Sequence, residues 1–337
     1  MSILCFNLDK NLKLFTMKNL FKIRNLTLIL SLFVLLISCN NDDKTTPPVD
    51  NSITGLALKT PDLSILVQAL QRTELTATLQ ASGTYTVFAP TNTAFTAFLA
   101  STPYATINDV PKAALTEILL NHVISTKLMA TDLTTGYIKT LAKGTASTTN
   151  TLSMYVNTTA GVKLNGVATV TTPNIMASNG VIHLVDKVIG LPTIVTHATA
   201  NPNFTSLVGA LTGPNQPDFV TVLSGAGPFT VFAPTNTAFT ALNTELAPGG
   251  IAGVSAANLT KVLQYHVVSP ANVLAATLTE GQIVTPILSP AQTFTIQLSG
   301  GAKIKDANNR SSNIVITDVQ CSNGVIHAID KVLLPLL

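Results

Sequence analysis

The residues of this chain that could perform chemistry are mainly histidines, and four of its five histidines form two matched pairs. His122 and His266 each end a segment with apolar residues three, four and seven positions apart, which is typical of one face of a helix. His183 and His327 each lie in an apolar segment with period two, which is typical of a strand. Such a histidine can be a general base or a metal ligand, or it can be buried and bonded to a backbone carbonyl.

We favour the buried, structural alternative for all four. No second histidine, cysteine or carboxylate stands near His122 or His266 at the spacing of a metal site. His183 and His327 are each followed three residues later by an aspartate, which points to the opposite face of a strand, so neither pair is a catalytic dyad. The fifth histidine, His197, lies between the repeats described below and is expected to be solvated. We therefore expect no metal site.

Motifs and charge exclude several other functions. The sequence contains no G-x-S-x-G, H-E-x-x-H, P-loop or C-x-x-C motif, so we expect no enzyme activity, with a hydrolase of unrecognised site as a weaker alternative. Five of the 19 basic residues and one of the 16 acidic residues precede residue 25, which leaves 14 basic and 15 acidic residues from Cys39 onward. Without a basic surface the chain is not expected to bind nucleic acid.

The histidines belong to a sequence that occurs twice. TVFAPTNTAF occupies residues 86–95 and again 230–239, and SNGVIHLVDKV at 178–188 returns as SNGVIHAIDKV at 322–332. Blocks in one order at a long, constant offset indicate two copies of one globular domain rather than a solenoid of short units. We place domain 1 at residues 53–191 and domain 2 at residues 192–337. Cys321 replaces Ala177 of the first copy, so we expect a small buried side chain there.

The repeated blocks predict the elements that position the histidines. In the first, side chains alternate as in a strand, Pro90 cannot extend the ladder, and Thr91 or Asn92 offers a side-chain oxygen to the N–H groups of a new helix. In the last, Asn179 and Gly180 lie between apolar runs and predict a two-residue hairpin turn, because both residue types tolerate positive φ. The corresponding residues of the second copy are Pro234, Thr235, Asn236, Asn323 and Gly324.

The first residues predict export. A positive segment is followed by the apolar residues 26–37, which are too few for a comfortable membrane span. They end in Leu-Ile-Ser-Cys39, which resembles the lipobox of bacterial lipoprotein signal peptides and implies cleavage before Cys39 and acylation of its sulfur. The alternative is an ordinary signal peptide or a buried helix that ends in cysteine. We expect a signal peptide at residues 1–38, with Met17 as a second candidate start, and a flexible tether at 39–52.

Taken in order, TVFAPTNTAF, the histidine at the helix end and NGVIH-x-x-DKV resemble the fasciclin-like domain family over nearly all of residues 53–337. The resemblance implies an α+β fold of two tandem fasciclin-like domains, each a wedge-like β-sandwich with helices packed at one side. It also implies adhesion or matrix binding without a cofactor. In some animal members a Tyr-His pair is tied to receptor binding. Tyr265 and His266 match that pair, whereas domain 1 has Asn121 and His122, and these four are the candidate interaction residues.

We therefore expect a non-enzymatic, lipid-anchored adhesion or interaction module, exported and held in the outer membrane at the cell surface. Its expected partner is the extracellular matrix, a surface protein or a polysaccharide. The alternative is a small-ligand or polysaccharide-associated lipoprotein accessory to an uptake system. The two copies differ at Asn121 and Tyr265, and where QRTEL is replaced by the longer TGPNQPDF. Because shared residues explain the shared fold, we expect a partner to be recognised by residues that differ, chiefly in domain 2 through Tyr265.

Overall fold

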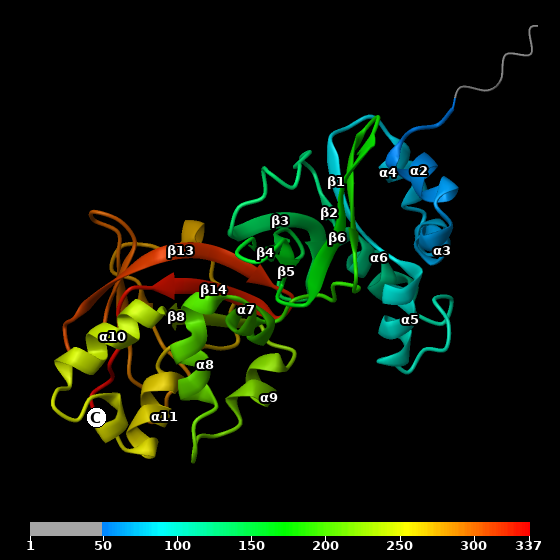
Figure 1. Ribbon diagram of the computed structural model, residues 1–337. Coiled ribbons are helices and arrows are strands. Elements are labelled where there is room, and N and C mark those ends of the chain that lie inside the picture. Colours follow the sequence, from blue (N-terminus) through cyan, green and yellow to red (C-terminus); the bar gives the residue numbers. More distant parts are fainter. Residues whose placement is uncertain (1–48) are drawn as a thin grey trace, which may run out of the picture. The chain divides into compact units, whose positions relative to one another are not determined.

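The computed structural model describes residues 49–337, so the predicted signal peptide, Cys39 and most of the predicted tether lie outside the described residues. Within the described range, helices and then a mixed sheet occur twice in succession (Figure 1). The predicted α+β class and the two tandem domains are confirmed. None of the helices formed by residues 49–337 is long and apolar enough to cross a membrane.

Domain 1 begins with helices and continues into its sheet. Its elements are α2 (Ile53–Lys59), η1 (Pro61–Leu63), α3 (Ser64–Arg72), α4 (Thr76–Gln80), β1 (Tyr85–Pro90), α5 (Asn92–Ala100), α6 (Lys112–Leu120), β2 (Val123–Ile124), β3 (Gly136–Lys143), β4 (Thr151–Asn157), β5 (Lys163–Leu164), β6 (Ala168–Ala177) and β7 (Gly180–Val185).

Domain 2 repeats this order, with the additional 3-10 helices η3 and η4. Its elements are α7 (Ile194–Ala200), η2 (Pro202–Phe204), α8 (Thr205–Leu211), α9 (Phe219–Ser224), β8 (Phe229–Pro234), α10 (Asn236–Glu245), η3 (Ile251–Gly253), α11 (Ala256–Gln264), β9 (Val267–Val268), η4 (Ala275–Thr277), β10 (Ile283–Val284), β11 (Phe294–Gln297), β12 (Lys303–Lys305), β13 (Ser311–Cys321) and β14 (Gly324–Ile329).

Each domain is built on one continuous sheet. Within residues 49–337 the strand orders are β2-β1-β7-β6-β5-β4-β3 and β10-β11-β12-β13-β14-β8-β9, which is the same topology twice. Strands β1 and β7 are parallel, in the register Phe88↔His183, and β8 and β14 repeat this pairing. In Figure 1, α8, α10 and α11 lie on one side of strands β13 and β14. The shared topology places corresponding residues of the two domains in corresponding surroundings.

Strand β1 is buried on both faces, as its alternating side chains predict. Val87 and Ala89 belong to the core beneath the helices, whereas Phe88 belongs to a second core with Met154 of β4 and Leu164 of β5. The long strand β6 pairs with β7 on one side and β5 on the other, with register shifts along its length. The two halves of the sheet can therefore enclose the second core between them, which gives the predicted sandwich-like arrangement from a single sheet.

The threonine and asparagine of the first motif divide the capping between two helices. Thr91 Oγ1 accepts a hydrogen bond of 3.3 Å from the N–H of Ala94 and so caps its own helix, α5. Asn92 Oδ1 instead accepts from the N–H of Ile65 in the neighbouring helix α3, at 2.9 Å. Thr235 and Asn236 repeat these roles in domain 2. The motif therefore fixes α5 against α3, and α10 against α8.

The predicted hairpin is present, but its asparagine and glycine act differently from the expectation. Ala177 pairs with Gly180, and Asn179 is not among the residues with positive φ. Asn179 Oδ1 accepts from the N–H of Ile53 at 2.9 Å, and its Nδ2 donates to the carbonyl of Leu79 at 2.7 Å, which ties the sheet to α2 and α4. Gly180 is required because a Cβ there would lie 2.1 Å from the carbonyl oxygen of Tyr85. Asn323 and Gly324 repeat both features.

Candidate functional site

The histidines at the helix ends are buried and fully engaged with the backbone. His122 is 2% exposed, its Nδ1 lies 2.7 Å from the carbonyl oxygen of Ile118, and its Nε2 accepts from the N–H of Ile189 at 2.9 Å. His266 is 3% exposed and makes the same two contacts. Because Nε2 accepts, Nδ1 carries the proton and donates to the carbonyl. The predicted hydrogen bond to a backbone carbonyl is confirmed.

This bonding leaves the two rings no role as a base or a ligand in this conformation. Burial lowers the pKa of His122 and of His266 to about 4, so both rings are neutral near neutral pH. The one lone pair of each neutral ring already accepts a backbone N–H. In the part of the chain that the structure describes, no group of three or more His, Cys, Asp or Glu side chains is arranged to hold a metal ion.

The strand histidines contact the neighbouring long strand, β6 or β13, where the pairing register shifts. Both are 0% exposed, and His183 stacks on Phe88 with ring centroids 5.5 Å apart. Its Nε2 lies 2.9 Å from the carbonyl oxygen of Leu128, and its Nδ1 accepts from the N–H of Asn174, whose φ is 63°. His327 repeats these contacts in domain 2, with Phe232, Val273 and Asp318. The predicted packing and hydrogen-bonding roles are confirmed, and the bulge in β6 explains why a histidine stands there.

The candidate interaction residues do not form a surface. Tyr265 and Asn121 are both 0% exposed, and His122 and His266 are buried as described. The hydroxyl of Tyr265 donates to the carbonyl of Thr293 at 2.6 Å and accepts from the N–H of Ala307 at 3.2 Å. The expectation that Tyr265 presents its side chain to a partner is therefore wrong for this fold. A helical apolar pattern marks the inner face of α11, and Tyr265 directly follows that helix and packs inward.

Two further residues are buried in domain 2. Cys321 is 0% exposed within the core beneath the helices, as expected, and burial raises the pKa of its thiol. His197 is also 0% exposed, which corrects the expectation of a solvated histidine. Its ring meets that of Tyr137 edge-on at 5.4 Å, and burial lowers its pKa to about 3. His197 lies in the helix α7, so it belongs to the fold rather than to a linker.

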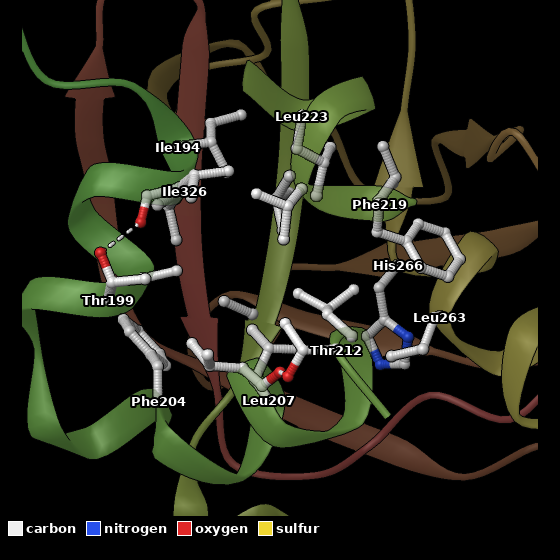
Figure 2. Close-up of a pocket in the computed structure, with 18 of the residues that line it drawn as sticks. Ile194, Thr199, Phe204, Leu207, Thr212, Phe219, Leu223, Leu263, His266 and Ile326 are labelled. Carbon is white, nitrogen blue, oxygen red and sulfur yellow. Dashed lines mark hydrogen bonds between the residues drawn. The ribbon is translucent and has the colours of Figure 1, made fainter. Parts of the chain in front are cut away.

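A small apolar cavity lies under the helices of domain 2. Figure 2 shows Phe204, Leu207, Leu223 and Ile326 around it, with His266 at its edge. Its volume is about 40 Å³, far below the roughly 300–1,000 Å³ of ligand pockets. Domain 1 has a cavity of about 20 Å³ at the corresponding positions, which include Leu63, Leu66, Leu79, Ile182 and His122. Because it occurs in both copies, this cavity is a packing feature of the fold.

A much larger depression distinguishes the two domains. An open groove of about 700 Å³ lies in domain 2 between α8 with its following loop on one side and α10 with α11 on the other, and we call it the α8–α10 groove. Its walls and floor include Ser206, Gly209, Gly213, Asn243, Ile251, Val254 and Leu259. Its volume falls in the range of ligand-binding pockets. None of the described residues that line it is ionisable.

The groove exists because small or polar residues replace larger ones of domain 1. Ile65, Gln68 and Arg72 along α3 correspond to Ser206, Gly209 and Gly213, and Leu99 of α5 corresponds to Asn243. In domain 1 the guanidinium of Arg72 donates to the carbonyl of Val110 at 2.8 Å and so bridges the space that is open in domain 2. The signal for this site was present in the sequence, where QRTEL is replaced by TGPNQPDF.

The apolar residues at the floor of the groove are more exposed than their counterparts in domain 1. Ile107, Val110 and Leu115 of domain 1 are 3%, 1% and 0% exposed. Their counterparts in domain 2, Ile251, Val254 and Leu259, are only half-buried. The same apolar positions are therefore covered in one copy and accessible in the other.

Comparison with known proteins assigns this architecture to a family. The model of the Fasciclin domain matches residues 61–192 and 202–335. Protein sll1483 of Synechocystis is 40% identical over 143 residues, which are 42% of this chain and 73% of that protein. Human periostin is 29% identical over 273 residues, which are 76% of this chain and 29% of periostin.

The fold matches as well. A FAS1 domain pair from the insect cell adhesion molecule Fasciclin I superimposes with a TM-score of 0.50 at 19% sequence identity, and the match covers 82% of this chain and 97% of that one. The two family matches span most of the described residues, and both carry the repeated motifs. This chain belongs to the Fasciclin domain family, of which it contains two tandem domains.

Proposed function

We propose that this protein is a non-enzymatic adhesion or interaction module, exported and anchored at the outer surface of the cell by a lipid on Cys39. The observation that carries the proposal is the tandem pair of Fasciclin domains, an arrangement shared with a domain pair from an insect cell adhesion molecule. The engaged ring nitrogens of the repeated histidines support structural rather than catalytic roles for the motif residues.

The partner in this proposal is a matrix component, a surface protein or a polysaccharide. The near balance of 14 basic and 15 acidic residues from Cys39 onward argues against nucleic acid. The histidines of the repeated motifs, together with Asn121 and Tyr265, are buried. We therefore infer that the partner contacts faces on which the two domains differ. The α8–α10 groove, of about 700 Å³, lies on such a face.

Adhesion is tested by comparing cells that carry the chain with cells from which its gene is deleted. We expect carriers to attach more strongly to surfaces coated with matrix proteins or with neighbouring cell-surface proteins. Beads coated with the purified chain should reproduce the attachment. Equal attachment of both cell types and of bare beads contradicts the proposal.

A screen of the purified chain against ester, peptide and glycoside substrates tests the absence of hydrolase activity.

The lipid anchor is tested at Cys39. The wild-type protein is expected to partition into the detergent phase, because an acyl chain contributes about 0.8 kcal/mol per buried CH₂. Cys39→Ser should move the protein to the aqueous phase or leave its signal peptide uncleaved. Cys5→Ser is the matched control, because Cys5 lies within the predicted signal peptide. A wild-type protein found in the aqueous phase rules out the anchor.

A small-ligand lipoprotein accessory to an uptake system is the second candidate function. The observation in its favour is the α8–α10 groove, whose volume of about 700 Å³ falls in the range of ligand-binding pockets. The tandem pair of Fasciclin domains favours adhesion, so we rank this function second.

A further inference from the structure

We propose that the α8–α10 groove of domain 2 binds a short, uncharged, extended segment of a partner polypeptide. This inference rests on the proposed function and specifies its partner class. The groove lies where Ser206, Gly209 and Gly213 replace the larger residues of α3, and the motifs that build the fold leave it unexplained. Its glycines, its apolar floor and its amide-bearing rim together define the ligand.

The glycines of one wall are not needed by the fold. Gly209 lies inside α8, and a Cβ placed on it would meet no heavy atom within 4 Å. Glycine in a helix interior destabilises a protein relative to alanine, so its presence here calls for a reason outside the helix. At the next turn Gly213 takes the place of Arg72. Glycine lets another backbone approach closely, and two of them on one wall suit an extended peptide chain.

The floor suits small aliphatic side chains. Ile251, Val254 and Leu259 are half-buried at positions whose counterparts in domain 1 are covered. Phe239, the aromatic residue of the groove, is 6% exposed and offers almost no ring face. Sugar rings are commonly bound by stacking on exposed aromatic faces, and this groove provides none. An aliphatic floor without such a face favours a peptide over an oligosaccharide.

The rim supplies the polar groups that a peptide backbone requires. Asn243 is exposed, and its Oδ1 accepts from the N–H of Ile251 at 3.0 Å, which orients its amide nitrogen as a donor. A side-chain amide offers the same donor and acceptor types as a peptide group. Because no lining residue of the described chain is ionisable, a charged side chain in the ligand would lose hydration without gaining a partner. The bound segment is therefore uncharged.

One end of the groove is held in place by its own hydrogen bonds. Gln216, in the loop that replaces QRTEL, donates through Nε2 to the carbonyl of Ala256 at 3.2 Å. Its Oε1 accepts from the hydroxyl of Thr260 at 2.9 Å. These bonds fasten the loop to α11 before any ligand arrives. A wall that is already ordered lowers the entropic cost of binding.

The experiment selects a phage-displayed library of random decapeptides against the purified full chain and measures the enriched peptides by fluorescence anisotropy. The test variant carries Gly209→Gln and Gly213→Gln, which fill the groove without adding charge. Ala257→Gln places the same side chain at an exposed position of α11 that does not line the groove. Asn243→Leu introduces the domain 1 residue and removes the rim amide. It is the test variant if circular dichroism shows that the doubly filled variant does not fold.

We expect the enriched peptides to be uncharged over their central residues. Filling the groove should lower the affinity for these peptides by at least about tenfold, which is about 1.4 kcal/mol of binding free energy. Ala257→Gln should leave the affinity unchanged. Asn243→Leu should also weaken them. Enrichment of charged peptides, equal binding to the filled variant, or displacement by a neutral dextran oligomer would overturn the proposal.

Cell attachment separates this proposal from the proposed function. Loss of both peptide binding and attachment in the filled variant supports the groove as the adhesive site. Retained attachment with lost peptide binding overturns that role and leaves the adhesion function intact. Peptide binding at the groove by a chain that never mediates attachment overturns the proposed function and supports the peptide site itself.

Discussion

Domain 1 and domain 2 agree closely in their interiors and differ along one helix pair. Both bury a histidine with the same two backbone bonds, at 2.7 Å and 2.9 Å in each copy. Between α3 and α5, domain 1 places Ile65, Gln68, Arg72 and Leu99, and the corresponding pair α8 and α10 leaves a groove of about 700 Å³. Loss of these hydrogen bonds would leave buried backbone groups unpaired and destabilise each domain, so the interior is constrained. The outer helix pair could change without disturbing the sheet.

The largest loss of stability is expected from changes at the buried histidines that the two domains share. His122→Ala and His266→Ala should each destabilise their own domain by about 3–4 kcal/mol, because each leaves a buried carbonyl and a buried N–H unpaired and opens a void. Thermal unfolding of the full chain, followed by calorimetry, measures both. Similar losses at the two positions support equivalent interiors, and a loss in one domain alone would break the comparison. Tight zinc binding abolished by either change would overturn the structural assignment.

The same histidines predict a pH dependence of stability. In the fold the pKa of each is about 4, below the ordinary value of 6.5, so the unfolded chain binds more protons between these values. Their contribution is fully present above pH 6.5 and is lost as the pH falls toward 4, by about 3 kcal/mol for each ring. Denaturation midpoints measured over this range should fall with pH. His122→Gln with His266→Gln should reduce the slope of this curve and leave the part due to His197, His183 and His327, whose pKa values burial also lowers.

A smaller loss of stability is expected from changes along α3, where the two domains differ. Gln68→Gly with Arg72→Gly introduces the glycines of domain 2 into α3 and should destabilise domain 1 by about 2–3 kcal/mol. The change removes the bond from Arg72 to the carbonyl of Val110 and uncovers apolar residues beneath it. The free energy of unfolding and the binding of a fluorescent apolar dye measure the two consequences.

The exposed pair Lys112 and Glu74 supplies the control for this experiment. Lys112→Ala breaks an ion pair of 2.6 Å between side chains that are 51% and 81% exposed, so it should leave the free energy of unfolding nearly unchanged. An equally small effect of the double glycine variant would mean that Gln68 and Arg72 do not cover the core of domain 1.

The sequence predicted those features that depend on local pattern. The strand at Tyr85–Pro90, the helix start after it and the hairpin before His183 follow from alternation, proline and turn residues, and the structure contains all three. Whether Thr91 or Asn92 capped the helix could not be decided, because Asn92 bonds to Ile65 in another helix. A contact between segments that are distant in the sequence cannot be predicted from the pattern of neighbouring residues.

The candidate site was harder to predict for the same reason. Tyr265 follows an apolar helical face whose inward side could be read, yet its bonds to Thr293 and Ala307 come from a distant part of the chain. The groove was visible only as a difference between the two copies, and its depth depends on packing that involves α10 and α11. The difference between the two copies marks the segment, whereas the shape of the groove depends on contacts between distant helices.

The smallest expected effect tests whether the difference between the domains serves binding. Gly209→Ala should stabilise domain 2 by about 0.5–1 kcal/mol, because alanine is the better helix former and its methyl group meets no heavy atom within 4 Å. Gly213→Ala is the control: it lies beyond α8, and its methyl group would come 3.4 Å from the carbonyl oxygen of Gly209, so little or no gain is expected. Chemical denaturation measures the stabilities, and anisotropy with an enriched decapeptide measures the affinity. A gain in stability with weaker peptide binding indicates that the glycine is kept for the groove. A loss of stability in Gly209→Ala would mean that the helix itself requires glycine, and this part of the case for a peptide site would fail.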